Sequence, residues 1–299
     1  MKLMDKIDNH DAYLKQIHLF LNQMYHTLLY CDDEALLSTE AAMKKFKHIE
    51  TSWMNIEKND CLSKYDFNKE VKDVSVVEAA LKKHPVYDHA LFHYFSLEAN
   101  KSEIQAFISS ESILNLEFFD YLSLSIIGTA DHIKSEIMLN LWDEAGRGNI
   151  QHFHTTLFSR LMQGLNLSYK RDLIAANMCW EGLAGINLFS YLALYSFNKS
   201  QYFGLLAATE MLDPPHYQKL LQGLKRLFLP TEIDISYYVE HETIDRQHGY
   251  AWLEKIIIPE LKKYPHKTPS FWLGFYLRLD SVQRYYDSLL QTFLRKNAA

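Results

Sequence analysis

The sequence predicts an all-α protein, and three observations support this fold class. Apolar residues recur at spacings of three and four along almost the whole chain of 299 residues, as they do on the buried face of a helix. Long alternating β patterns and hairpin signals such as Asn-Gly are missing from the sequence. Only ten glycines and seven prolines interrupt the pattern, and they are few enough to mark the ends of helices.

The first part of the chain is expected to be a helical extension. The stretch "AYLKQIHLFLNQMYHTLLY" carries apolar residues at helical spacing. We therefore divide the chain at Pro85 into an N-terminal helical extension, residues 1–85, and a core domain, residues 86–299.

Further breaks are expected at Gly128, at the Pro214-Pro215 pair, at Pro230 and at Pro259. The helices expected between these breaks are residues 102–127, 131–145, 149–163, 170–197, 201–211, 215–228, 233–257 and 269–296.

Composition narrows the classes of partner and compartment. The net charge of −6 comes from interspersed charges without a basic block, so nucleic acid is not expected as a partner. Cys31, Cys61 and Cys179 lack CxxC spacing, which favours neither a disulfide framework nor a cysteine zinc site and fits a reducing cytoplasm. The start of the chain lacks the apolar region of a secretory signal, and we expect a cytoplasmic protein.

The longest apolar stretch, residues 173–197, raises the question of membrane insertion. Asn177, Glu181 and Asn187 interrupt it, and a carboxylate at the centre of a bilayer costs roughly 2.5–3.5 kcal/mol. We therefore expect a buried core helix and no membrane partner.

The stretch "YYVEHETIDRQHGY", residues 237–250, is the first of the candidate metal-binding motifs. Steps of four and three place His241, Asp245 and His248 on one face of a helix. Two imidazoles and a carboxylate suit iron, manganese or zinc. The alternative is a polar, exposed helix face whose histidines have no role as ligands.

A second motif, "LWDEAGRGNIQHFHTTLF", places two glycines between Glu144 and His154. In an uninterrupted helix these two side chains would be about 80° short of sharing a direction. A break at Gly146 and Gly148 would allow both to point at one site. The alternative is an ordinary helix end and connection.

Two further acids stand on apolar helices. Glu210, in "LLAATEMLDPP", needs a partner that offsets its desolvation, either a metal ion or an arginine. Glu111, in "SSESILNLEFFDYL", competes with Glu117 on the same helix, and the two are six positions apart, so they cannot both point at one site.

Taken together, "ESILNLEFFDYL", "NLWDEAGRGNIQHFHTTLF", "TEMLDPP" and "HETIDRQH" resemble, in order and spacing, the haem-oxygenase-like diiron oxidase and oxygenase family, also described as iron-containing redox enzymes. The resemblance covers roughly residues 90–260. It implies a haem-oxygenase-like helical bundle that uses ferrous iron and O2 on small organic substrates. The reactions it implies include N-oxygenation, desaturation and oxidative C–C cleavage of a small amine, amino acid or fatty-acid-like metabolite.

The resemblance also implies a set of ligands for two Fe(II) ions per chain, with O2 as co-substrate. The matching positions favour Glu111 over Glu117 as the upstream ligand. His152 does not match a ligand position and is expected to be exposed or to lie beside a ligand. Asp143 fits the same motif and is expected to orient a ligand by hydrogen bonding. The implied ligands are Glu111, Glu144, His154, Glu210, His241, Asp245 and His248.

Other functions of the same bundle remain open at this point. A haem-binding histidine near the start of the chain would be His18 or His26, but that role leaves the carboxylates unexplained. A metal-free binding or assembly module and a cofactor-independent enzyme are further alternatives. No nucleotide-binding glycine loop is present, so electrons are expected from the small-molecule substrate or an external reductant. The interpretation also allows a homodimer.

Overall fold

The computed structural model describes residues 2–30 and 39–297, and these residues form helices and connections without a strand. The all-α prediction is thereby confirmed. In chain order the α-helices are α1 (Lys2–Tyr30), α3 (Glu40–Lys64), α4 (Val74–Lys83), α5 (Ala90–Leu97), α6 (Lys101–Ser125), α7 (Asp131–Glu144), α8 (His154–Gly164), α9 (Arg171–Asn177), α10 (Trp180–Leu194), α11 (Lys199–Leu227), α12 (Ser236–Ala251), α13 (Ile258–Lys263) and α14 (Thr268–Asn297). Short 3-10 segments connect several of them, and a π-helix, Trp252–Ile257, follows α12.

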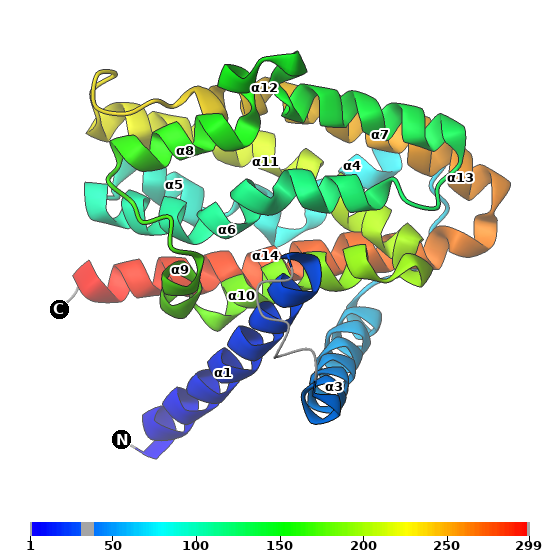
Figure 1. Ribbon diagram of the computed structural model, residues 1–299, viewed down its shortest axis with the longest axis horizontal. Helices are drawn as coiled ribbons and strands as arrows, with labels where there is room; N and C mark the ends of the chain where they lie inside the picture. Colours follow the sequence, from blue (N-terminus) through cyan, green and yellow to red (C-terminus); the bar gives the residue numbers. More distant parts are fainter. Residues whose placement is uncertain (1, 31–38, 298–299) are drawn as a thin grey trace.

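Helix α11 is the centre of the bundle, where it packs against α14, α12 and α5. In Figure 1, α10 and α14 form one side of the molecule, and α7, α8 and α12 lie on the opposite side. Helix α1 packs on α10 and α3 packs on α14, so both extend from the side away from α12 (Figure 1). The division at residue 85 stays a prediction.

The predicted break at the Pro214-Pro215 pair is wrong, because α11 runs through both prolines. Each proline removes a backbone hydrogen bond and disfavours a helix interior. Tertiary packing holds the helix on both sides of the pair. Gly204, before it, lets α14 approach so closely that a Cβ there would lie 2.2 Å from the carbonyl oxygen of Phe271, and Gly223, after it, meets α5 in the same way.

The predicted break at Pro259 is also wrong, because α12, the π-helix and α13 follow one another without interruption from Ser236 to Lys263. Two other boundaries differ from the prediction. The segment 170–197 forms two helices, α9 and α10, separated at Met178 and Cys179. The segment 149–163 begins with 3-10 turns, and its α-helix starts only at His154.

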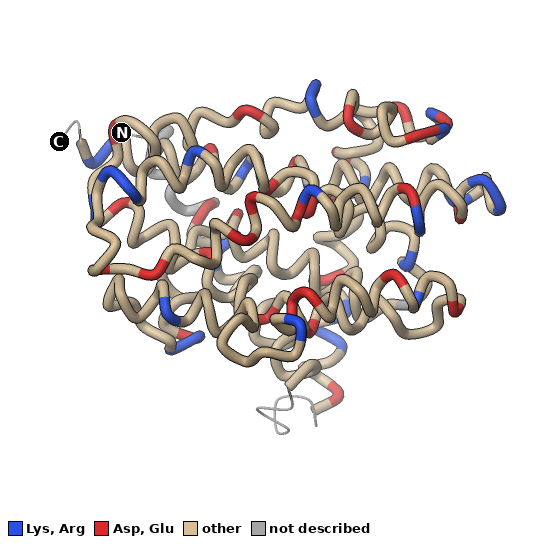
Figure 2. The backbone as a smooth tube through the Cα atoms, turned by 90° about the horizontal axis from the view of Figure 1, so that it is seen from above, with Lys and Arg blue, Asp and Glu red and all other residues tan. Residues whose placement is uncertain are grey.

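None of the helices in the described residues combines the length and apolar character of a membrane span. Figure 2 shows basic and acidic positions interspersed along the described backbone.

Candidate metal centre

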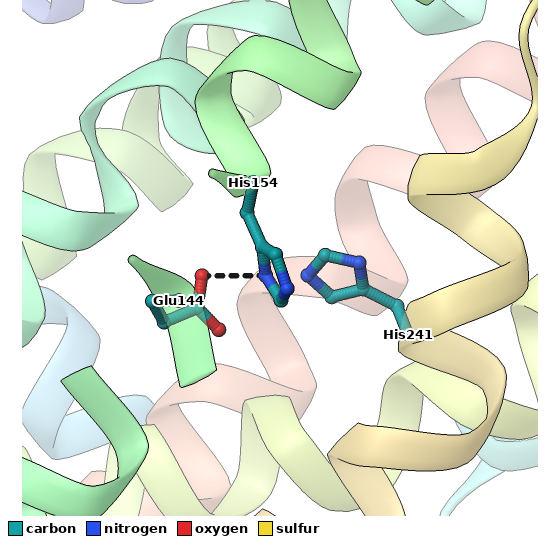
Figure 3. A group of neighbouring side chains, drawn as sticks. All are labelled: Glu144, His154 and His241. Atoms are coloured by element: carbon teal, nitrogen blue, oxygen red, sulfur yellow. Dashed lines mark ion pairs between the residues drawn. The ribbon is translucent and has the colours of Figure 1, made fainter. Parts of the chain in front are cut away.

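Glu144, His154 and His241 meet between three helices. Glu144 is the last residue of α7, His154 the first of α8, and His241 lies in the first half of α12. The carboxylate and the two rings point toward one another (Figure 3), and one ligand atom from each lies within 4.8 Å of the others. All three side chains are buried. Nδ1 of His154 is 2.8 Å from Oε2 of Glu144.

The glycine turn between α7 and α8 brings Glu144 and His154 together. Gly146, Arg147 and Gly148 all have positive φ angles, of 63°, 54° and 84°. This left-handed run is favourable for glycine and strained for other residues. It ends α7 and folds residues 152 and 153 back against Gly146, where a Cβ would lie 2.4 Å from the carbonyl carbon of His152. The segment is therefore a helix end that also sets the direction of both side chains.

The second group consists of Glu210, Asp245 and His248, which lie on the facing sides of α11 and α12. One ligand atom from each again lies within 4.8 Å of the others, and all three are buried. The alternative of an exposed face of α12 is wrong for this motif. Glu210 accepts a 3.2 Å hydrogen bond from Nδ2 of Asn140. Among the described residues, no arginine forms an ion pair with Glu210.

Hydrogen bonds to the far side of two rings orient their other nitrogens toward these groups. Nδ1 of His241 lies 2.7 Å from the carbonyl oxygen of Tyr237, so Nδ1–H donates and Nε2 keeps its lone pair. Nε2 of His248 lies 3.3 Å from Oδ2 of Asp143, which leaves Nδ1 beside Glu210. Backbone carbonyls and carboxylates hold metal-binding histidines in this manner.

The inward-facing nitrogens are not satisfied by the protein. Nδ1 of His154 and Nδ1 of His248 are buried and have no hydrogen-bond partner among the described residues. The 2.8 Å contact between His154 and Glu144 is close, but the geometry is not that of a hydrogen bond. A carboxylate oxygen and a ring nitrogen that converge without sharing a proton are arranged as two ligands of one cation would be.

Burial and neighbouring charges shift the pKa values of several side chains in the two ligand groups. Burial and the neighbouring His154 lower the pKa of His241 to about 3. Burial and the Glu210 and Asp213 carboxylates raise the pKa of Asp245 well above its usual value. Burial alone would lower the pKa of His248, but the adjacent Glu210 carboxylate outweighs it and raises the pKa to about 9. The carboxylates crowd together so closely that, without a metal ion, the cluster retains protons.

Glu111 lines a small cavity between the two ligand groups. This cavity, of about 30 Å³, is also bordered by Glu144, Glu210, His241 and Asp245, and it has room for about one or two waters. Glu117, its rival, points elsewhere and accepts a 2.6 Å hydrogen bond from Nε of Arg171. The structure therefore brings six of the seven predicted ligands into two groups and places Glu111 at the cavity between them; their role as ligands stays a prediction.

The charges around this cavity fit a pair of divalent cations. Five carboxylates and one guanidinium line it, so with every carboxylate ionised they would carry four net negative charges, which two divalent ions would neutralise. Oxygen and imidazole donors in this mixture suit iron, manganese or zinc. The lining carboxylates are Glu111, Glu144, Glu210, Asp213 and Asp245, and the guanidinium belongs to Arg278.

Sequence reasoning missed Asp213, Asn140 and Arg278. Burial raises the pKa of Asp213 to about 7, and the Glu111 and Glu210 carboxylates act in the same direction. The Arg278 guanidinium acts in the opposite direction but does not outweigh them. The position of Asp213 three residues after Glu210 was the available signal, since that spacing puts both on one helix face. Nothing local marks Arg278, because its place at the cavity depends on the packing of α14.

The other residues considered from the sequence lie as follows. His152 is exposed and its Nδ1 is 3.4 Å from Glu240. His18 stacks on Trp180 at 5.6 Å and contacts Asn187, and His26 lies 3.6 Å from Glu117. Neither of these two borders the cavity between the ligand groups. The structure thus gives the haem alternative no support.

A surface cleft of about 420 Å³ reaches the first group at His154. Glu240 stands on its rim, with Oε2 3.7 Å from Nε2 of His154. The cleft is lined by Asp143, Gly146, Arg147, His152, His154, Val239, Glu240, Thr243, Ile244 and Gln247. His154 thus belongs to a buried ligand group and also lines a surface cleft.

Comparison with known proteins agrees with this geometry. The family model described as iron-containing redox enzyme, which is haem-oxygenase-like, matches residues 105–283. Two crystal structures of a CADD-like protein of unknown function from Nostoc punctiforme PCC 73102 are similar in fold. One has 15% identity and a TM-score of 0.54 over 81% of this chain and 97% of that chain; the other has 17% and 0.56 over 80% and 99%. No curated protein matches. The predicted haem-oxygenase-like, all-helical fold is confirmed.

Proposed function

The chain belongs to the family of iron-containing redox enzymes, and we propose that it is an O2-dependent oxidoreductase that holds two ferrous ions between α7, α8, α11 and α12. The observation that carries the proposal is the pair of adjacent buried ligand groups with inward nitrogens that no protein group satisfies. The substrate is a small amine, amino acid or fatty-acid-like metabolite.

Each group would hold one ion. Glu144, His154 and His241 would bind the first, and Glu210, Asp245 and His248 the second, with Glu111 supplying a carboxylate from the cavity between them. When bound, the two ions supply electrons and open coordination positions for the reduction of O2 during substrate oxidation. The substrate or an external reductant would replace the electrons consumed.

The protein's own contribution is orientation and the exclusion of water. The Tyr237 carbonyl and the Asp143 carboxylate fix the rings of His241 and His248. Phe118 and Tyr237 border the cavity, whereas Phe158 and Tyr238 are fully buried packing residues outside it. Asp213, whose pKa is about 7, can hold or release a proton beside the ligands near neutral pH.

The test begins with iron content. Purified protein is loaded anaerobically with Fe(II), desalted and analysed for iron, and about two ions per chain are expected from the two groups. The loaded protein is then mixed with oxygenated buffer in a stopped-flow instrument, with and without members of a substrate panel. A transient absorption band whose formation or decay a substrate accelerates supports the proposal. Negligible iron, or iron that is inert to O2 across the panel, contradicts it and favours a binding or storage role.

A further inference from the structure

The ring of His154 lacks the far-side hydrogen bond that orients the other two histidines of the ligand groups. Nδ1 of His241 is 2.7 Å from the carbonyl oxygen of Tyr237. Nε2 of His248 is 3.3 Å from Oδ2 of Asp143. Nε2 of His154, on the opposite side of the ring from its inward-facing Nδ1, makes no hydrogen bond within the part of the chain that the structure describes. One of the three rings therefore needs another acceptor if its direction is to be fixed in the same way.

The carboxylate of Glu240 lies beside this nitrogen. Its Oε2 is 3.7 Å from Nε2 of His154, and its Oε1 is 3.4 Å from Nδ1 of His152. The carboxylate thus lies between two imidazole rings and turns one oxygen toward each. The side chain of Glu240 is 37% exposed and that of His154 is 4% exposed. A small rotation of the longer, more exposed side chain would therefore shorten the 3.7 Å contact to a hydrogen bond.

The backbone on both sides of this contact is fixed by the ligand groups themselves. Glu240 directly precedes His241 on α12, and the ring centres of His241 and His154 are 4.3 Å apart. On the other side, His152 precedes the first residue of α8 by two positions, and its carbonyl carbon packs closely on Gly146 in the turn after α7. The contact of Glu240 therefore joins α12 to the start of α8 at the point where the first ligand group forms.

We propose that Glu240 is a positioning residue, whose carboxylate accepts a hydrogen bond from Nε2–H of His154 and keeps Nδ1 directed at a metal ion in the first ligand group. This inference rests on the proposed function for the presence of that ion. Nδ1 binds an ion through its lone pair, so the ring proton must be on Nε2, where it needs an acceptor. A carboxylate in this place fixes the tautomer and makes the ring a stronger ligand.

Two simpler explanations of the contact need a matched control. Glu240 and His152 could form an ordinary exposed ion pair, which contributes little, or the negative charge of Glu240 could attract a cation without any hydrogen bond to His154. Glu242 separates the second explanation from the proposal. It flanks His241 on the other side, is also partly exposed, and makes no hydrogen bond or ion pair with any residue in the ranges 2–30 and 39–297. Glu242→Met removes the same charge without removing an acceptor from His154.

The first measurement is the affinity for Zn(II), which binds to imidazole and carboxylate ligands and has no redox chemistry of its own. Competition with a chelator gives the affinity of each variant. Glu240→Met should weaken the binding of one ion about tenfold or more, as loss of an orienting partner does. Glu240→Gln keeps a neutral acceptor and should lose less, and Glu242→Met should bind zinc like the wild type. Equal affinities of Glu240→Met and Glu242→Met overturn the proposal.

The second measurement is the ring proton of His154 in the zinc-loaded protein, which a purely structural role of Glu240 would not affect. Long-range ¹H–¹⁵N NMR spectra identify the protonated nitrogen of each ring, and we expect Nε2–H for His154, in slow exchange with water. Glu240→Met should accelerate this exchange, whereas the ring protons of His241 and His248, which have other acceptors, should exchange as in the wild type. A His154 ring with its proton on Nδ1, or with an exchange rate that Glu240→Met does not change, overturns the proposal.

Failure of this inference can be distinguished from failure of the proposed function. Iron that is inert to O2, in a protein whose zinc affinity depends on Glu240, contradicts the proposed function and supports the role of Glu240. A wild-type protein that binds neither metal contradicts both. Zinc binding that is the same with and without Glu240 contradicts the role of Glu240 alone. If Glu240→Met does not fold, Glu240→Gln takes its place, and unchanged zinc affinity together with unchanged proton exchange in that variant overturns the proposal.

Discussion

Gly146→Ala should destabilise the protein, although glycine-to-alanine changes in helical segments usually stabilise. Gly146 has a φ of +63°, and an added methyl would lie 2.4 Å from the carbonyl carbon of His152 and 2.5 Å from the amide nitrogen of Phe153. These are backbone atoms that cannot rotate away. The perturbation therefore combines a strained conformation with a steric clash.

Gly128→Ala separates the two contributions. Gly128 also has a positive φ, of +75°, but a methyl there would meet nothing within 4 Å. A left-handed alanine costs about 1–2 kcal/mol, and the stiffer unfolded chain offsets about 0.4–1 kcal/mol of this. The control should lose about 1 kcal/mol of unfolding free energy. The clash at Gly146 adds about 1–3 kcal/mol, as overpacking does, so that variant should lose about 2–4 kcal/mol.

Iron binding should distinguish the two variants as well. Gly146 stands two residues after Glu144, and the backbone it would displace directly precedes His154, so the clash separates two ligand atoms now 2.8 Å apart. Urea unfolding of the metal-free proteins gives the stability difference, and anaerobic Fe(II) titration gives the affinity. If Gly146→Ala is as stable as Gly128→Ala and binds iron like the wild type, the turn does not set the ligand geometry.

Three further predictions follow from the ligand groups. His241→Ala and His248→Ala should each abolish binding of at least one iron and all turnover, whereas the exposed His152→Ala should keep both ions; metal analysis checks this, and full iron in either ligand variant contradicts it. Glu111→Gln should weaken iron binding, whereas Glu117→Gln should leave it unchanged and cost about 1–3 kcal/mol of stability by unpairing Arg171; the opposite pattern would make Glu117 the ligand. The pKa of His248 is raised from 6.5 to about 9, so its protonated ring stabilises the folded protein. This stability is fully present below pH 6.5 and is lost as the pH rises through 9. Metal-free wild type should therefore lose up to about 3 kcal/mol between these pH values, and His248→Ala much less, in urea unfolding; equal losses would refute the assignment.

The sequence predicted those features that depend on local pattern. Spacings of four and three placed His241, Asp245 and His248 on one buried face of α12, because side-chain direction in a helix repeats every 3.6 residues. The two glycines marked the end of α7, because their positive φ angles are a local property of the backbone. Features of this kind can be read without knowing the partner helices.

The features that the sequence did not reveal depend on packing between distant segments. Pro214 and Pro215 are strong helix breakers locally, but the contacts of α11 with α14 and α5 override them. Arg278 is one of several arginines in the sequence, and only the packing of α14 against α10 and α11 places it at the cavity. In the sequence, only the family pattern separated Glu111 from Glu117. In the structure, Arg171 donates a hydrogen bond to Glu117.

The two ligand groups share structural elements. Loss of a ligand from one group is therefore expected to weaken the binding of the ion in that group and can also weaken the binding of the other ion. Helix α12 contributes His241 to the first group and both Asp245 and His248 to the second. Adjacent residues at the end of α7 divide in the same way, since Glu144 belongs to the first group and Asp143 contacts the ring of His248. An ion in either group would therefore order the backbone that positions ligands of the other, and it would also offset the negative charge that raises the pKa of Asp245. Order favours the second ion, and repulsion between the two cations opposes it. Because five carboxylates surround the pair, the repulsion is largely neutralised, and we expect the two ions to bind with positive cooperativity.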